Sequence, residues 1–310
     1  MTQSRLPVHW KPGFLYYTSL FGEGTVDLWF NGISRPVRLS DNATTLLPLI
    51  RQIVSSWPFN EKPDEHPDPV ITVWSHDNGY SRTSLWLDEA KSYPDPVNAV
   101  CDFIVDLTHA YNADQPDTLC LHCAATIIGG QLVIFPNGYN QGKSTFMALL
   151  ASRGVRVLCD DVMPLDLATF KGHALGIQPR LRVPVPTTLG PDFGSFVLGH
   201  AGPSSRRFQY LKLESDMLAS FGESFPIGGI VILERNDTGD NTITDAVQAD
   251  TLKAIILRNF ADSMPAANIL DGLLSLIEQA RLFRLNYAQG DQAERLLLET
   301  FGTQPEVNAQ

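Results

Sequence analysis

Short apolar runs in the first third of the chain alternate with polar residues and are separated by Gly, Asn and Asp. This pattern is typical of strands joined by turns. Thr44–Ser56 instead repeats apolar residues at helical spacing and predicts a helix, whereas Asn60–Asp68, rich in Pro and acidic residues, predicts an exposed loop. The predicted strands are Phe14–Ser19, Thr25–Asn31, Pro36–Leu39, Val70–Ser75 and Ser81–Leu87.

The remainder of the chain mixes helical and strand periodicity. Asp95–Ala110 has apolar residues at helical spacing and leads into a strand at Leu119–His122, so we place a domain border near residue 92. We expect an α/β fold with a mixed sheet in residues 93–302, a smaller strand-rich N-terminal domain in 1–92 and a disordered tail in 303–310. Further predicted elements are the strands Gly228–Glu234 and Leu282–Tyr287 and the helices Ala246–Asn259, Ala267–Arg281 and Asp291–Phe301.

Two apolar runs in the middle of the chain predict a tight hairpin. His122–Ile128 and Gln131–Phe135 are both strand-like, and only two glycines separate them. A two-residue turn makes Ile128 face Gln131, because paired positions in an antiparallel hairpin sum to a constant. Counting back in the same register, His122 faces Asn137, fifteen positions away in sequence.

The second strand of this hairpin runs into an altered phosphate-binding loop. The pattern requires glycine, four free positions and then Gly-Lys-Ser/Thr. Asn137 stands at the first glycine position, and asparagine is the non-glycine residue that most readily accepts a positive φ. Lys143 is expected to reach the β- and γ-phosphates, and Ser144 to ligate Mg²⁺. The candidate phosphate-binding residues are Asn137, Gly138, Tyr139, Asn140, Gln141, Gly142, Lys143, Ser144 and Thr145.

The residues after the loop complete the order that a Mg-nucleotide site requires. A predicted helix places its positive N-terminal end at the phosphates and stops at Gly154. Val155–Cys159 is a second predicted strand, and Asp160 and Asp161 stand at its carboxyl end. Strand, loop, helix, strand and acid pair together predict binding of ATP with Mg²⁺.

Cationic residues further along could neutralise charge at such a site. In the Pro-rich segment Gly176–Pro186, Arg180 and Arg182 alternate with apolar residues, so in an extended backbone both share a face. Arginines near a phosphate-transfer site stabilise developing negative charge. A basic lid is a second candidate, formed by Arg206, Arg207 and Lys212.

Composition narrows the class of partner. The chain has 310 residues, 44 % of them hydrophobic and 18 % charged, and a net charge of −11, which disfavours nucleic acid and anionic membranes as partners. We find no apolar run of about 18 residues and no apolar export segment at the N-terminus, and we expect a cytoplasmic protein. Cys120 and Cys123 fall on opposite faces of a strand, which favours buried thiols over a shared metal or disulfide.

Three segments in order resemble the catalytic core of the HPr kinase/phosphorylase family: His122 with Cys-Ala-Ala, the loop ending Gly142-Lys143-Ser144, and Leu158–Asp161. The resemblance covers residues 120–166 well and 95–300 loosely. It implies the fold of ATP-dependent phosphoenolpyruvate carboxykinase and transfer of a phosphate to serine, in HPr or other acceptors, including the terminal serine of lasso peptides. We find no match to the segment by which true HPr kinases dock HPr, so HPr is not the expected acceptor.

The resemblance also implies roles within the site. Lys143 and Ser144 match the residues on phosphate and metal, and His122 matches the histidine beside the acceptor. We assign Asp160 to Mg²⁺ and Asp161 to the base, although the two could be reversed. Open alternatives are a nucleotide-binding regulator with little transfer activity, which the altered loop front motivates, and, more weakly, a carboxykinase.

The acceptor and the N-terminal domain are left open by the sequence. The acceptor is a hydroxyl-bearing protein, peptide or small metabolite. The N-terminal domain serves packing, homo-oligomerisation or acceptor recognition, and no catalytic constellation in it separates these alternatives.

Overall fold

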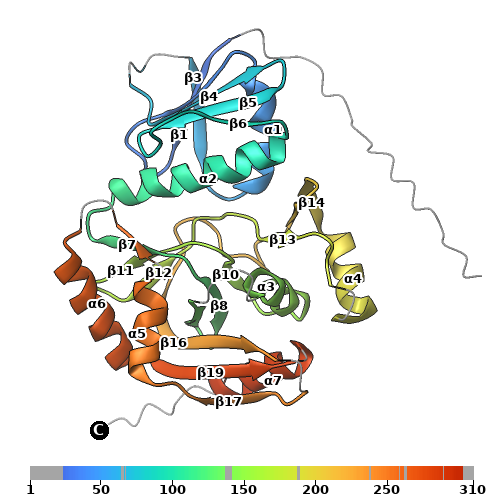
Figure 1. Cartoon of the computed structure of the whole chain (residues 1–310), viewed down its shortest axis with the longest axis vertical. Coiled ribbons are helices and arrows are strands. Elements are labelled where there is room, and N and C mark those ends of the chain that lie inside the picture. The colour runs from blue at the N-terminus through green and yellow to red at the C-terminus, as the bar shows by residue number, and fades with distance from the viewer. Residues whose placement is uncertain are drawn as a thin grey trace, which may run out of the picture.

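Two sheets, one in each half of the chain, lie on either side of helix α2 (Pro96–Ala113) in the computed structural model (Figure 1). The described residues are 24–302, apart from 64–65, 67, 137–141, 187–188, 237–238, 258, 262–263 and 289. The predicted strand Phe14–Ser19 and the tail 303–310 lie outside them. The chain is an α/β protein with mixed sheets, as the sequence predicts.

Six strands form the N-terminal sheet, in the order β3-β1-β2-β4-β5-β6. β2 and β4 pair in parallel and the other neighbours pair antiparallel. A parallel pair needs a crossover connection, which here contains the 3₁₀ helix η1 (Ala43–Leu46) and α1 (Leu47–Ile53). The strands are β1 (Val26–Phe30), β2 (Val37–Ser40), β3 (Phe59–Pro63), β4 (Ile71–His76), β5 (Gly79–Ser84) and β6 (Lys91–Tyr93).

Helix α2 packs most of its apolar side chains into the N-terminal core. Asp95 caps the helix by accepting a hydrogen bond from the Asn98 N–H at 3.0 Å, and Pro96 opens it with a pre-set φ. Phe103 and Leu107 are almost fully buried in one cluster with residues of β1, β2, β4 and α1. The helix thus contributes to the N-terminal core while leading directly into the larger sheet, and the domain border near residue 92 stays a prediction.

Ten strands form the larger sheet, in which only the pairs β9–β16 and β16–β19 are parallel among the described pairings. The main path runs β10-β8-β9-β16-β12-β11-β7-β18, and β19 pairs with both β16 and β17. Its strands are β7 (Thr118–Leu121), β8 (Ala124–Ile128), β9 (Gln131–Phe135), β10 (Val157–Cys159), β11 (Met163–Asp166), β12 (Lys171–His173), β16 (Ser224–Arg235), β17 (Thr242–Asp245), β18 (Asn259–Phe260) and β19 (Arg281–Tyr287).

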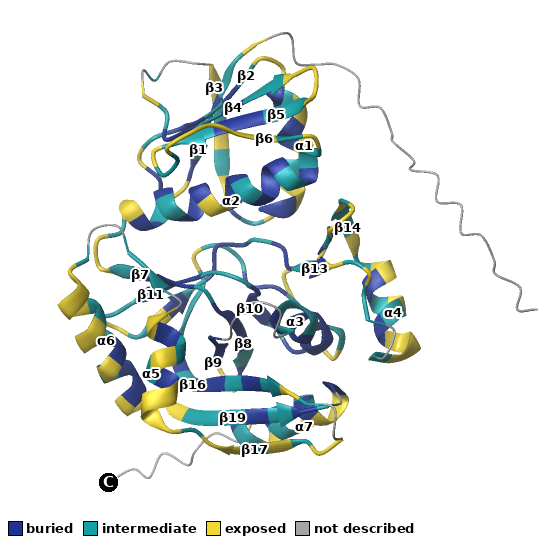
Figure 2. Ribbon diagram, in the orientation of Figure 1, coloured by how far each residue is buried: buried dark blue, intermediate teal, exposed yellow. Residues whose placement is uncertain are grey.

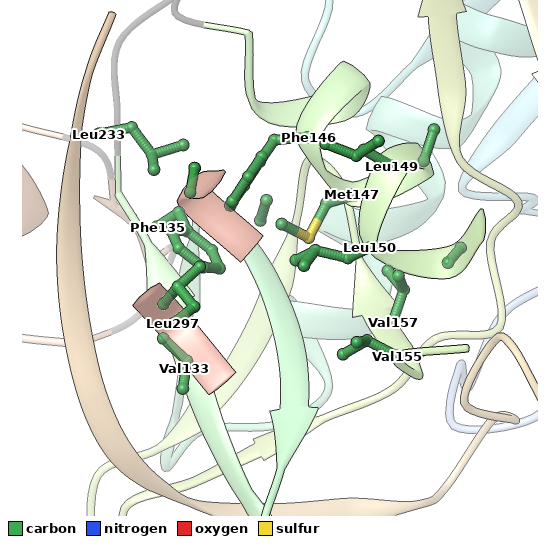
Figure 3. Close-up of a cluster of buried hydrophobic side chains, with 14 of the residues drawn as sticks. Val133, Phe135, Phe146, Met147, Leu149, Leu150, Val155, Val157, Leu233 and Leu297 are labelled. Carbon is green, nitrogen blue, oxygen red and sulfur yellow. The ribbon is translucent and has the colours of Figure 1, made fainter. Parts of the chain in front are cut away.

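The largest core of this sheet surrounds α3 (Lys143–Ser152). Phe146, Met147 and Leu150 of α3 belong to one buried cluster with Val133, Phe135 and Val157 of the neighbouring strands, and Figure 3 shows Phe146 beside Phe135. The Phe135 and Phe146 rings meet edge to face, with centroids 5.8 Å apart. Figure 2 shows the buried positions concentrated on β8, β9 and β10 beside this helix. The strand before the predicted phosphate loop and the helix after it are therefore fixed by one packed core.

Smaller elements complete the fold. β13 (Arg180–Arg182), β15 (Phe208–Leu211) and β14 (Ala201–Ser204) form a three-stranded antiparallel sheet, and α4 (Gly190–Gly199) precedes β14. The C-terminal helices are α5 (Gln248–Ile256), α6 (Ala266–Gln279) and α7 (Gly290–Phe301), close to the predicted ranges. The sequence pattern did not predict α4, because Gly and Pro interrupt it.

One loop prediction in the N-terminal half is wrong. Asn60–Asp68 was expected to be an exposed loop, but Asn60–Pro63 belongs to β3, which pairs antiparallel with β1 from Phe59 to Pro63. β3 is an edge strand, and its polar side chains remain largely exposed. An edge strand tolerates charges and proline because only one side of its backbone must pair.

Gly176 holds the chain close to the N-terminal unit just before β13. Its φ is +69°, and an added Cβ would lie 2.1 Å from Ser56 Oγ and 3.0 Å from the Ser56 carbonyl carbon. We expect Gly176→Ala to lower the free energy of unfolding by about 2–4 kcal/mol, since left-handed backbone strain adds to a steric clash.

Gly154→Ala is the matched control for Gly176→Ala. Gly154 has a φ of +81°, but nothing lies within 4 Å of its added Cβ. This variant should lose only about 1 kcal/mol, the cost of the backbone strain. Urea unfolding of both variants measures the difference. Equal decreases in the free energy of unfolding would show that Ser56 moves away from the added Cβ at no energetic cost.

Candidate functional site

The predicted phosphate loop connects β9 to α3. Gly142 caps α3 with a φ of 82°, which glycine adopts at little cost. A Cβ at this position would lie 3.1 Å from the Tyr287 hydroxyl. Position 142 therefore favours glycine for two reasons: the backbone has a positive φ, and a side chain there would approach the Tyr287 hydroxyl. The front of the predicted loop lies outside the described residues and comprises Asn137, Gly138, Tyr139, Asn140 and Gln141.

Lys143, Ser144 and Thr145 form the first turn of α3. The N–H groups of a first turn have no partners within the helix, and the macrodipole makes this end positive. Lys143 is buried, with 7 % of its surface exposed, and Thr145 is half-buried. A cation and N–H groups that the helix itself does not pair lie together at one helix end, which is a favourable environment for phosphate oxygens.

The acid pair follows β10, which pairs antiparallel with β8. Asp160 is buried, with 6 % of its surface exposed, and its carboxylate accepts a hydrogen bond from the Ser144 hydroxyl. The same carboxylate accepts a second hydrogen bond, at 3.0 Å, from the backbone N–H of Arg180. The end of β10, the start of α3 and the start of β13 therefore converge on Asp160.

Burial and charge act together on Asp160. Loss of solvent, reinforced by the negative charge of Asp161, raises the pKa of the Asp160 carboxyl to about 6, although the hydrogen bonds from Arg180 and Ser144 oppose the rise. The positive charge of the Arg180 guanidinium offsets only part of the negative charge of the two carboxylates. A cation bound here would offset more of it.

Asp161 is more open and is held by two side chains. His122 Nδ1 lies 3.2 Å from one carboxylate oxygen, and the Arg180 guanidinium lies 3.4 Å from the other. The Asp161 side chain is 41 % exposed. The three residues form a charged group in which one carboxylate is oriented from both sides while remaining accessible.

The hairpin prediction is correct for its turn and wrong for its first residue. Ile128 pairs with Gln131 and Ala124 with Phe135, in the predicted register. His122 does not continue this strand, because β8 begins at Ala124 and the Cys123 N–H bonds back to the Leu121 carbonyl at 3.1 Å. His122 lies between β7 and β8, where the chain passes from one part of the sheet to another, and its side chain contacts Asp161.

The two arginines of β13 have different surroundings. The Arg180 guanidinium contacts Asp161 and the Cys101 thiol and lies 4.6 Å from the centroid of the Phe208 ring. Arg182 is exposed. The two side chains leave β13 on the same side, as an alternating strand requires, but the structure brings only Arg180 to the acid pair.

The predicted basic lid is not gathered beside the acid pair. Arg206 and Arg207 are exposed between β14 and β15, and the Arg207 guanidinium lies 5.4 Å from the Phe208 ring centroid. Lys212 lines a separate cavity of about 320 Å³ beside α1. The guanidinium groups of Arg207 and Arg180 therefore both lie near the Phe208 ring, whereas Lys212 lies at a different cavity.

A small pocket of about 50 Å³ opens beside Asp160 and Asp161. One wall comes from α2 and includes Cys101, whose thiol hydrogen-bonds Tyr210. The sequence analysis missed Cys101, Tyr210 and Phe208 as neighbours of the site. Their local patterns are those of an ordinary helix and strand, so only the packing of the two units reveals them.

The oxygen donors at the acid pair fit a magnesium ion. Mg²⁺ prefers hard oxygen ligands, is held by one or two protein groups and completes its shell with phosphate and water. The Ser144 hydroxyl and the buried Asp160 carboxylate, already within hydrogen-bond reach, form such a pair. The described residues contain no cluster of three or more His, Cys, Asp or Glu that would suit a metal held by protein alone.

Two further findings concern the whole described chain. All four cysteines are buried free thiols. Between residues 24 and 302, outside the gaps given above, no helix has the length and apolar character needed to cross a membrane.

Comparison with known proteins adds little to this geometry. No protein-family model matches the chain, and no curated protein matches it. Among solved structures, the Hpr(Ser) kinase/phosphatase from Coxiella burnetii resembles it with a TM-score of 0.30 and 13 % identity, covering 58 % of this chain and 95 % of that one. A likeness this weak supports no inference by itself, so the function must be argued from the site.

Proposed function

We propose that this protein is a Mg-ATP-dependent kinase that transfers the γ-phosphate to an aliphatic hydroxyl, with serine as the expected acceptor residue. The observation that supports the proposal most directly is the hydrogen bond between Ser144 and Asp160. It joins the first turn of the helix after the loop to the acid at the end of the neighbouring strand, the two places from which a nucleotide-bound magnesium takes its protein ligands.

The roles follow from the surroundings of each side chain. Lys143, at the positive end of α3, binds the β- and γ-phosphates. Ser144 and Asp160 hold Mg²⁺, which neutralises phosphate charge when bound. Asp161, oriented by His122 and Arg180, accepts the proton of the acceptor hydroxyl as the new O–P bond forms and the bond to ADP breaks.

The size of the pocket supports an aliphatic acceptor. A volume of about 50 Å³ beside the acid pair is sufficient for a small group such as a hydroxymethyl. Phosphoryl transfer depends mainly on positioning and on charge neutralisation. The pocket and the charged group of His122, Asp161 and Arg180 provide these two requirements for a small hydroxyl.

Transfer of γ-labelled phosphate from Mg-ATP to separated protein, peptide and metabolite fractions tests the proposal. We expect label in one fraction, and a decrease of about 10²-fold or more with Lys143→Ala, because the cation that positions the phosphates is lost.

Lys253→Ala on α5 removes an exposed lysine outside the site and is the matched control. It should transfer label at the wild-type rate. Tight ATP binding without label in any fraction would favour a nucleotide-binding regulator instead. Unchanged transfer by Lys143→Ala would remove the phosphate loop from the mechanism.

A further inference from the structure

Helix α2 has a second face, turned toward the acid pair. Cys101, Ile104, Val105 and Thr108 line the pocket beside Asp160 and Asp161. Their spacing of three and four residues places them along one side of a helix. Phe103 and Leu107 pack into the N-terminal core. One helix of the N-terminal unit therefore supplies a wall of the proposed transfer site.

Val105 is the open position on this face. From Val97 to Asn112 every other residue of α2 is buried or half-buried, whereas Val105 is 48 % exposed. An aliphatic side chain left in water at the pocket gains free energy when a second apolar group covers it. Because Val105 lies at the pocket, it would contact the part of the acceptor that is next to the hydroxyl-bearing group.

The pocket separates polar from apolar chemistry. Asp160, Asp161 and Arg180 provide its charged groups, while Ile104, Val105 and Val162 are among the aliphatic side chains that line it. The volume of about 50 Å³ holds little more than the hydroxyl-bearing group itself. A neighbouring part of the acceptor must therefore lie outside, against Val105, where an aliphatic group is favoured over a carboxylate.

We infer that the exposed Val105 face of α2 selects the acceptor, and that the acceptor is a peptide segment with an aliphatic residue next to the phosphorylated hydroxyl. This inference rests on the proposed kinase function and assigns acceptor selection to the N-terminal unit. Val105 is a specificity-determining residue rather than a participant in phosphate transfer.

A charge swap tests the inference. It uses two synthetic heptapeptides with a central serine, which is flanked by leucine on both sides in one peptide and by aspartate on both sides in the other. Binding is measured by fluorescence anisotropy with Mg²⁺ and a non-hydrolysable ATP analogue, and phosphate transfer is measured separately with ATP. We expect the wild type to bind the leucine peptide about tenfold more tightly, the effect of burying one aliphatic side chain. Val105→Lys should reverse this preference, because an ammonium attracts the aspartates.

The ratio of the two affinities is insensitive to general loss of folding or of ATP binding. Leu85→Asp, at a 61 % exposed aliphatic position elsewhere in the N-terminal unit, should keep the wild-type ratio. Equal wild-type affinities, absent binding of both peptides, or an unchanged ratio in Val105→Lys would overturn the inference. Selective binding of the leucine peptide without its phosphorylation would support acceptor selection by the Val105 face and contradict only the proposed kinase reaction.

Discussion

Replacing Asp161 by asparagine should lower the rate of phosphate transfer by about 10²- to 10⁴-fold, the range typical for loss of a general base. Asparagine has the same shape as aspartate but cannot accept the proton of the hydroxyl. Asp161 is the accessible member of the acid pair, held at 3.2 Å by His122 and at 3.4 Å by Arg180. Single-turnover transfer to the labelled acceptor fraction measures the effect.

Binding of Mg-ATP by the same variant should remain close to wild type, because Asp160 and Ser144 are unchanged. Calorimetric titration with Mg-ATP measures this. Asp88→Asn, at an exposed position in the N-terminal unit, is the matched control and should leave both quantities unaltered. Near-wild-type transfer with intact binding would mean that Asp161 is not the base. Loss of binding together with transfer would point to the reversed roles of the two acids.

Replacing Asp160 by asparagine should stabilise the ligand-free protein at pH 7.5 and remove Mg²⁺-dependent transfer. The pKa of Asp160 is raised by burial, and then by Asp161, from 3.8 to about 6. Keeping this carboxyl ionised in the fold therefore costs up to about 3 kcal/mol. Asparagine avoids that cost and can still accept the Arg180 N–H hydrogen bond, so a gain of about 1–3 kcal/mol is expected.

The pH dependence gives the sign of this effect. Below about pH 4, Asp160 is protonated in both the folded and the unfolded chain, and the wild type bears no ionisation cost. Between pH 4 and 6 the unfolded chain releases the proton first, so wild-type stability falls as the pH rises and then levels off. Thermal unfolding across this range should show the fall in wild type and not in Asp160→Asn. A variant less stable than wild type at pH 7.5 would contradict the expectation.

Local sequence patterns predicted the elements that bring the main groups together. The run Gln131–Phe135, the two glycines before it and the apolar face of α3 each specify their structure over a few residues, and β8 and β9 pair in the expected register. The acid pair follows its strand directly, so its placement opposite Ser144 follows from the order of strand, loop and helix. These features depend on contacts near in sequence.

The remaining features depend on contacts that no local pattern encodes. His122 reaches Asp161 because the chain changes strands at residues 122–123, a break that the apolar run conceals. Arg180 differs from Arg182 through the Cys101 thiol, 79 positions away. The edge strand β3 resembles a loop in composition, and only its pairing with β1 shows otherwise. In each case the local sequence is compatible with more than one structure, and tertiary packing determines which one forms.

Because α2 completes the N-terminal core on one side and the pocket on the other, the two halves of this protein cannot diverge independently. A substitution at Phe103 or Leu107 changes the packing of the same helix that carries Val105. Conversely, adaptation to a new acceptor is limited to changes that the N-terminal core tolerates. Exchanging the N-terminal sheet between related chains would transfer acceptor preference only if the exchanged segment included α2.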